Sequence, residues 1–209
     1  MALLDKLNWR YATKKFDTAK KVSNEQLNTL LDAIQLSPSS AGLQAYRVIV
    51  VSDPKLKEQL REAAYGQQQL TTASHIFVFA AETGLDSLYV KNYIDRIAEV
   101  RGIDRSTLSI FENNINNNIS SQTEDDKITW NKKQCYIALG VLVSAAAEAG
   151  IDACAMEGFD TAKFDEILGL KELGLTSAVI APIGFRAEDD HMSKAAKVRK
   201  PKEELFIHL

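Results

Sequence analysis

Apolar residues recur at helical spacing near the start of the chain, within residues 24–36. Leu or Ile occupies positions 27, 30, 31 and 34, so one face of a helix there would be apolar. Ser23 precedes this segment and Gln26 follows three positions later, which is the pattern of a capping box. The spacing therefore predicts an amphipathic helix that begins after Ser23 and stops before Pro38.

Strand patterns and helix patterns follow one another in the rest of the chain. Strands are predicted at residues 46–52, 75–81, 151–156 and 177–185, of which the third is short. Asp53 and Pro54 directly after the first strand are typical of a helix start. A second helical pattern ends near Gly102, and Asp160 precedes a third.

An asparagine-rich stretch separates these patterns from the most apolar part of the chain. Residues 113–118 contain five asparagines, and serine and glutamine follow them. Residues 109–129 thus have little periodic apolar content, which predicts either a mobile lid or a solvated helix.

Residues 130–149 return to good helix formers, and every position from Ile137 to Ala147 is apolar or small. A helix that is apolar on all sides is buried on all sides. In a chain of 209 residues, this is easiest if one face packs on the sheet and another on a second subunit. We therefore predict a homodimer with this helix in the interface; the alternative is the central core helix of a monomer.

No repeat and no linker rich in Pro, Gly or Ser divides the chain, so we expect one domain over residues 1–209. Helices outnumber strands without strict alternation, which favours an α+β fold with one central sheet flanked by helices.

Composition narrows the classes of partner. The chain has 25 Lys and Arg against 28 Asp and Glu, a formal net charge of −3. Because binding to a phosphate backbone needs an excess of basic residues, nucleic acid is not the expected partner. The longest apolar stretch has eleven residues (137–147), whereas a membrane span needs about 20. Small-molecule chemistry is the better expectation.

The expected compartment is the cytoplasm. Cys135 and Cys154 have no metal-binding or disulfide-framework spacing, which is typical of a reducing environment. Residues 1–7 lack the long apolar run of a signal peptide.

Several well-known site motifs are missing. There is no G-x-G-x-x-G, no G-x-x-x-x-G-K-[ST] and no G-x-S-x-G, which argues against a dinucleotide fingerprint, a P-loop and a serine nucleophile. His75, His191 and His208 are isolated from other metal-ligand types, so no metal is expected. We interpret His75, at the start of an apolar strand, as a structural imidazole.

Three weaker signals remain. Basic residues gather near both ends of the chain, around Arg10 and in the tail at 194–202; they predict either a phosphate site or a solvated basic tail. Small hydroxyl residues form the loop 38–42 between a helix and a strand. Gly158 follows a short strand, where it would let a flat ligand approach the backbone.

Taken in order, these pieces resemble the nitroreductase family of FMN-dependent NAD(P)H oxidoreductases, and most closely its oxygen-insensitive nitroreductases and dihydropteridine reductases. The segments that carry the resemblance are RYATKKFD (10–17), LSPSSAGLQAYRVIVV (36–51), ASHIFVFAA (73–81), the helix 130–150, GIDACAMEGFD (150–160), GLKELGLTS (169–177) and KVRKP (197–201). The resemblance implies a nitroreductase-like α+β fold, an intertwined homodimer, and FMN at the dimer interface.

The resemblance also implies roles for individual residues around FMN. The phosphate clamp would consist of Arg10, Lys197 and Arg199, with Tyr11, Ala12 and Thr13 alongside. Lys14 would lie beside the flavin N1 and C2 carbonyl, where reduction places negative charge. Glu157 and Gly158 would offer backbone N–H groups near N5 and O4. The partner subunit would contribute Pro38, Ser39 and Ser40.

This sequence departs from the family pattern at three places. Gly42 replaces an Asn, and Gln67, Gln68 and Gln69 stand where relatives carry an Asn and a second Lys on the pyrimidine edge. Gln67 and Gln69 can still pair with the flavin, but the lost cation predicts a less positive flavin potential than in two-lysine relatives. The asparagines at 113–118 stand where relatives place aromatic side chains over the substrate pocket.

The resemblance therefore implies an enzyme that reduces nitroaromatics, quinones or similar acceptors with NADH or NADPH in a ping-pong cycle, without a catalytic side chain. Three alternatives stay open. The same flavin could reduce enones or dihydropteridines; the protein could bind flavin without nicotinamide turnover; or it could be a dimeric interaction module without a cofactor. Substrate screening would identify the first alternative. Bound flavin that NAD(P)H fails to bleach anaerobically would favour the second. Arg10→Ala with Arg199→Ala would change nothing if the third is right.

Overall fold

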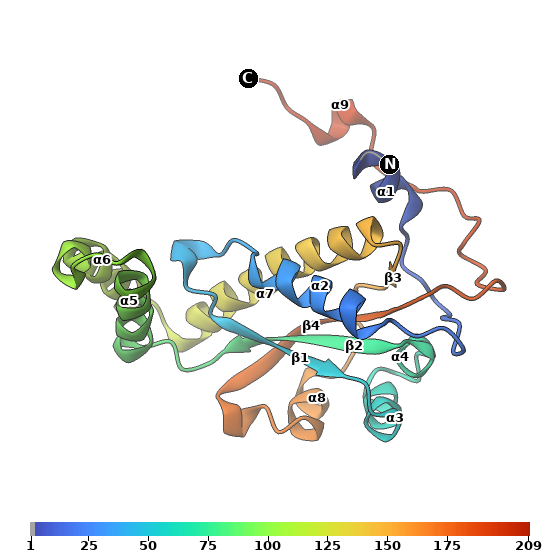
Figure 1. The fold of residues 1–209 in the computed structure, drawn as a ribbon, viewed down its shortest axis with the longest axis horizontal. Helices are drawn as coiled ribbons and strands as arrows, with labels where there is room; N and C mark the ends of the chain where they lie inside the picture. The colour runs from blue at the N-terminus through green and yellow to red at the C-terminus, as the bar shows by residue number, and fades with distance from the viewer. Residues whose placement is uncertain (1–2) are drawn as a thin grey trace.

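A four-stranded sheet runs through the middle of the molecule (Figure 1). The computed structural model describes residues 3–209. The strands are β1 (Tyr46–Val51), β2 (His75–Glu82), β3 (Asp152–Ala153) and β4 (Leu175–Gly184), in the spatial order β1-β2-β4-β3. Each neighbouring pair is antiparallel, a direction that the sequence pattern does not determine.

Helices cover both faces of the sheet, which confirms the predicted α+β class. α2 and α7 pack on one face, α3 and α8 lie on the other, and α5 and α6 pair beyond one end of the sheet (Figure 1). The helices are α1 (Leu3–Trp9), α2 (Asn24–Gln35), α3 (Pro54–Ala63), α4 (Gln69–Thr72), α5 (Ser87–Arg101), α6 (Ser109–Ser120), α7 (Glu124–Glu148), α8 (Thr161–Ile167) and α9 (Lys202–Leu205), with short 3-10 turns η1 (Ser40–Gly42), η2 (Arg105–Leu108) and η3 (Lys171–Leu173).

The central strand β2 divides the core into two halves. Phe77 and Phe79 point toward α2 and α7, whereas Ile76 and Val78 belong to the cluster with α3 and α8. Successive side chains of a strand point to opposite faces, and both faces are covered here. The run HIFVFAA is therefore apolar at nearly every position instead of alternating.

Local signals place most helix ends where they were predicted. The side chain of Ser23 accepts from the backbone N–H of Gln26, and the Gln26 side chain accepts from the Ser23 N–H, which completes the capping box of α2. Asp53 caps α3, Asp160 caps α8, and Gly102 ends α5 in the left-handed conformation. These ends are fixed by interactions within a few residues of sequence.

The asparagine-rich stretch forms the helix α6, which is the second of the two predicted alternatives, although one face of this helix is buried instead of solvated. Ile115 and Ile119 are buried and lie four residues apart on α6, with the asparagines around them. The following helix α7 begins at Glu124, six residues before the predicted start, because Thr123 caps it. The predicted third strand is shorter than expected, and beyond β3 only an isolated bridge joins Met156 to Ile180.

One face of α7 stays open in the single chain, contrary to burial on all sides. Tyr136 and Ile137 are each 42% exposed. Gly140, one turn later, has no heavy atom within 4 Å of the position that a Cβ would take. The open face is what the predicted second subunit would cover. No helix between residues 3 and 209 is long and apolar enough to cross a membrane.

Candidate functional site

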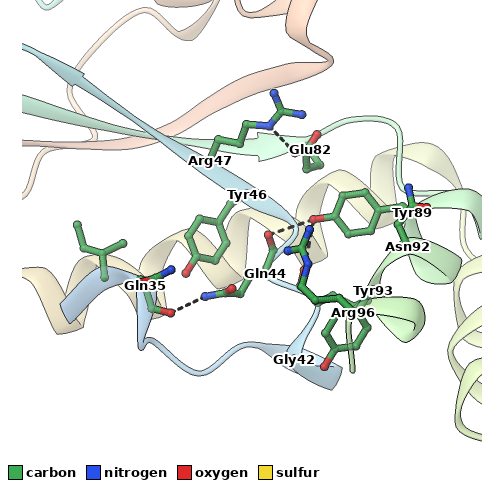
Figure 2. Close-up of a pocket in the computed structure, with 12 residues that line it drawn as sticks. Gln35, Gly42, Gln44, Tyr46, Arg47, Glu82, Tyr89, Asn92, Tyr93 and Arg96 are labelled. Carbon is green, nitrogen blue, oxygen red and sulfur yellow. Dashed lines mark hydrogen bonds and ion pairs between the residues drawn. The ribbon is translucent and has the colours of Figure 1, made fainter. Parts of the chain in front are cut away.

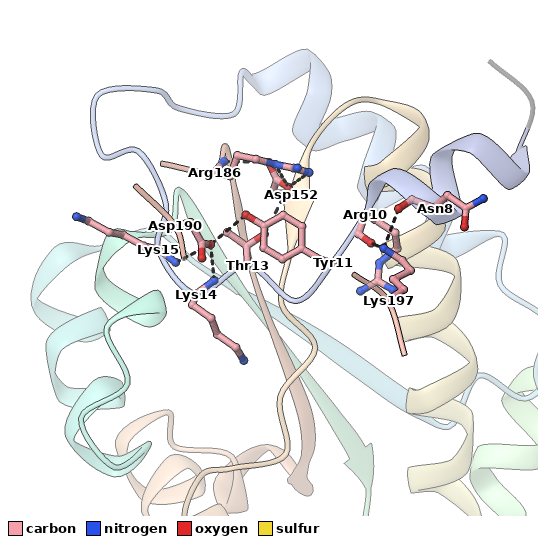
Figure 3. A network of polar contacts seen from close by, with 10 residues as sticks. All are labelled: Asn8, Arg10, Tyr11, Thr13, Lys14, Lys15, Asp152, Arg186, Asp190 and Lys197. Carbon is pink, nitrogen blue, oxygen red and sulfur yellow. Dashed lines mark hydrogen bonds and ion pairs between the residues drawn. The ribbon is translucent and has the colours of Figure 1, made fainter. Parts of the chain in front are cut away.

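The N-terminal segment and the C-terminal tail meet, although more than 170 residues separate them in sequence (Figure 3). The Lys197 ammonium donates to the carbonyl oxygen of Asn8 at 2.8 Å and also to that of Arg10. A cavity of about 310 Å³ lies beside this contact, between the end of α1 and residues 192–197. The structure thus joins the two basic groups that the sequence places at opposite ends.

Three cations, Arg10, Lys197 and Arg199, gather here. Burial, and then the charge of Arg199, lowers the pKa of Arg10. Burial followed by the charges of Arg10, Arg199 and Arg186 lowers the pKa of Lys197. The Nε of Arg10 is buried and has no hydrogen-bond partner among residues 3–209. A buried donor without an acceptor is costly, so this cluster fits a bound phosphate group.

The carboxylate of Asp152 fixes the backbone of the segment that carries Arg10. Asp152 accepts from the Arg186 backbone N–H at 2.9 Å and from its Nε at 2.8 Å. The Arg186 guanidinium also lies over the rings of Trp9, at 4.2 Å, and Tyr11, at 4.6 Å. The hydroxyl of Thr13 is fully buried and donates to Asp152 at 3.4 Å. The residues from Trp9 to Thr13 are therefore held against the end of β4.

The ammonium group of Lys14 has no carboxylate partner among the hydrogen bonds and ion pairs of residues 3–209. Its Nζ donates to the Sγ of Cys154 at 3.9 Å. Burial raises the pKa of Cys154, so the thiol is neutral at neutral pH. An uncompensated cation in this place fits a ligand edge that gains negative charge.

The turn after β3 is held from two sides. The Glu157 carboxylate accepts from the hydroxyl of Tyr136 on α7 at 2.6 Å. Burial and this hydrogen bond raise the pKa of Tyr136 to about 12. The carbonyl oxygen of Gly158 accepts from the Gln67 side chain, also at 2.6 Å. The backbone N–H groups of Glu157 and Gly158 donate to no acceptor in the described part of the chain, so they are free for a ligand.

The two glutamines predicted at the pyrimidine edge form one unit. Gln69 is buried, and its Nε2 donates to the Oε1 of Gln67 at 3.1 Å. Gln67 in turn also donates to the carbonyl of Ala64 at 3.0 Å. That they contact a flavin stays a prediction. In the structure, the hydrogen bond from Gln67 to the Gly158 carbonyl holds the turn.

The loop with Pro38, Ser39 and Ser40 lies elsewhere in the single chain. The backbone N–H of Ser40 donates to Gln134, in the first half of α7, at 2.8 Å. Lys6, next to the cation cluster, instead donates to the carbonyl of Glu148 at the last residue of α7. These two positions on α7 are about 20 Å apart along the helix axis, at about 1.5 Å per residue. One chain therefore does not bring the loop to the cations.

A larger cavity, of about 560 Å³, lies between the 42–47 segment and α5 (Figure 2). Arg47 pairs with Glu82 at 3.0 Å, and the Tyr89 hydroxyl donates to the carbonyl of Gln44 at 3.2 Å. None of the residues predicted to bind FMN lines it; these partners are internal to the fold. The departure at Gly42 is explained here, because a Cβ at this position would collide with the hydroxyl of Tyr93.

A third cavity, also of about 310 Å³, adjoins the loop at Ser40 and Ala41. Asn114, Asn118 and Gln122, all with side-chain amides, are among the residues that line it, together with Trp130. This pocket gives the asparagines of α6 a defined place at the loop.

Some residues that build the site carry no local sequence signal. Asp152, Arg186, Asp190 and Tyr136 act through partners distant in sequence, and sequence reasoning missed them. Met1 and Ala2, part of the segment examined for a signal peptide, lie outside the described residues. Among residues 3–209 no cluster of three or more His, Cys, Asp and Glu is placed to hold a metal ion.

Comparisons with known proteins agree on one family and one fold. The model of the nitroreductase family matches residues 7–185. The chain is 36% identical over 215 residues to "Putative NAD(P)H nitroreductase SH0546" of Staphylococcus haemolyticus, covering 98% of this chain and 95% of that protein. The solved "putative nitroreductase ydfN" of Bacillus subtilis has a TM-score of 0.89 at 20% identity, covering 99% of this chain and 98% of the other.

A further solved structure carries a ligand. The "putative nitroreductase in complex with FMN" of Exiguobacterium sibiricum has a TM-score of 0.86 at 17% identity, covering 100% of this chain and 98% of the other. These likenesses confirm the fold that the sequence resemblance implied.

Proposed function

The chain belongs to the nitroreductase family, and on that premise we propose that it is an FMN-dependent NAD(P)H oxidoreductase. It reduces nitroaromatics, quinones or related acceptors by a ping-pong transfer of two electrons as hydride. The observation that carries the proposal is the cation cluster with the buried, unpartnered Nε of Arg10, because a phosphate group supplies the acceptors that it lacks.

Different residues of the chain bind the phosphate, the pyrimidine edge and the reactive edge of the cofactor. Arg10, Lys197 and Arg199 bind the phosphate, and the segment Tyr11–Thr13 lies alongside. Lys14 presents a positive charge to the pyrimidine edge. The free N–H groups of Glu157 and Gly158 orient the reactive edge.

The chemistry that FMN would supply when bound is two-electron transfer from the nicotinamide to the acceptor. No side chain has to act as acid or base in that exchange. Because Gln67 and Gln69 carry no charge, Lys14 alone stabilises negative charge at this edge. We expect a flavin potential more negative than that of relatives with two lysines, and an equal or more positive value in a redox titration would contradict this.

A homodimer completes the site in this proposal. Pro38, Ser39 and Ser40 reach the partner's cofactor, which accounts for their distance from the cations in one chain. The amides of Asn114 and Asn118 then line the same pocket as Ser40. Such donors favour acceptors with exposed oxygen atoms, as in nitro groups and quinones.

Removing the phosphate clamp tests the proposal. Charge-assisted hydrogen bonds contribute about 1.5–3 kcal/mol each, so Arg10→Ala with Arg199→Ala should weaken FMN binding by about a hundredfold or more. Titration with FMN, followed by quenching of flavin fluorescence, measures the affinity. The control is Lys194→Ala with Lys202→Ala, two exposed lysines of the same tail. Equal affinity in the two double variants would contradict the clamp.

A further inference from the structure

A buried carboxylate stands at the junction of the two segments that carry the cations. Asp190 is 2% exposed. Its Oδ2 accepts from the backbone N–H of Lys14 at 2.8 Å, from that of Lys15 at 3.2 Å, and from the hydroxyl of Tyr11 at 3.1 Å. Its Oδ1 accepts from the backbone N–H of Met192 at 3.0 Å. Figure 3 shows the carboxylate between Tyr11 and Lys14.

These contacts fix both segments of the proposed FMN site at once. Three of the donors lie within residues 11–15, the stretch that carries Lys14 and follows Arg10. The fourth fixes the beginning of the tail that carries Lys197 and Arg199. Without this carboxylate, three donors near the N-terminus would lose their acceptor.

The chemistry of the contacts requires an ionised acceptor. Burial by itself raises the pKa of Asp190, but the hydrogen bonds from Met192, Lys14, Lys15 and Tyr11 together lower it. The group is therefore a carboxylate at neutral pH, and an amide in its place would turn an N–H group toward N–H donors. Its hydrogen bonds come from three backbone N–H groups and the Tyr11 hydroxyl, and none comes from a cationic side chain in the described part of the chain. Asp190 thus orders the cation-bearing segments without replacing the phosphate.

We propose that Asp190 is a positioning residue for the cofactor site. It holds residues 11–15 and the start of the tail together, so that Arg10, Lys14 and Lys197 can bind one ligand. This role rests on the proposed function. It acts through the backbone and Tyr11, and Asp190 itself touches no ligand.

Asp190→Asn and Asp189→Asn form a matched pair that tests the role. Both remove one negative charge, but Asp189 is exposed and pairs only with the ammonium of Lys15 among the ion pairs of residues 3–209. We expect Asp190→Asn to weaken FMN binding at least tenfold and Asp189→Asn to change it less than twofold. In FMN-loaded protein, Asp190→Asn should also make the flavin midpoint potential more negative, because Lys14 is displaced; a change that affected only folding would leave this potential unmoved.

Tyr11→Phe provides a second and milder variant, because it keeps the ring that contacts Arg186 and removes only the hydroxyl that donates to Asp190. It removes one of the donors to Asp190 and should weaken FMN binding twofold to fivefold. Wild-type affinity in both Asp190→Asn and Tyr11→Phe would overturn the positioning role alone, as would equal losses in Asp190→Asn and Asp189→Asn. A wild-type protein that binds no FMN would instead overturn the proposed function, and this role with it.

Discussion

The backbone conformation and the neighbours of Gly42 explain why this position is a glycine. Its φ of +74° lies in the left-handed region, and the hydroxyl of Tyr93 occupies the space of a side chain. The sequence shows Gly42 as a departure from the family pattern but gives no reason for it. The reason is a contact with α5, about fifty residues later, which no local pattern could reveal.

Gly42→Ala should therefore destabilise the protein more than the same change at Gly66. Gly66 has a similar φ of +73° but nothing within 4 Å of its missing Cβ. A left-handed residue with a side chain costs about 1–2 kcal/mol, which is the loss expected for Gly66→Ala. Urea unfolding should give a larger loss for Gly42→Ala, partly recovered by adding Tyr93→Phe. Equal losses at the two glycines would contradict the contact.

Helices and strands were predictable where their signals are local, and less so where tertiary contacts decide. Ser23, Asp53 and Asp160 cap helices through bonds to residues three positions away. The start of α7 has such a signal as well, since Thr123 precedes three acidic residues. The predicted start at residue 130 rests instead on the apolar run that follows. The site residues Asp152 and Asp190 lack any such signal, because all of their hydrogen-bond partners named here except Met192 lie 34 to 179 positions away.

The helix α6 provides the test at this scale. Its asparagines surround a buried face of isoleucines, of which Ile119 is 4% exposed. Truncating a buried Ile costs about 2–5 kcal/mol, so Ile119→Ala should lower the free energy of unfolding by about that amount. Asn117→Ala, at an exposed position of the same helix, should change it by less than about 0.5 kcal/mol. Equal and small effects would mean that α6 is not packed as described.

At the scale of the whole molecule, several apolar side chains are left exposed within residues 3–209 of one chain. Besides the open face of α7, the tail beyond α9 exposes Phe206 by 55% and Ile207 by 85%. α9 lies near α1, and the C-terminal segment beyond α9 extends away from the body of the molecule (Figure 1). An intertwined homodimer would cover such surfaces, and it would bring the Ser40 loop of one subunit to the cations of the other.

Gly140→Arg tests this assembly without disturbing the single chain, because the missing side chain of Gly140 faces open space. We expect the substitution to shift the protein from dimer to monomer in sedimentation velocity and to lower FMN binding in parallel. Gly84→Arg is the control, since Gly84 also has no neighbour within 4 Å. A Gly140→Arg protein that stays dimeric with full FMN binding would place the interface elsewhere.

The cofactor and its reduction by a nicotinamide are the centre of this account. The most direct measurement is the visible absorption spectrum of the purified protein, recorded before and after anaerobic addition of NADH or NADPH. We expect a flavin spectrum near one FMN per chain that bleaches with at least one of the two nucleotides. A protein that stays colourless after incubation with FMN, or bound flavin that neither nucleotide bleaches, would contradict it.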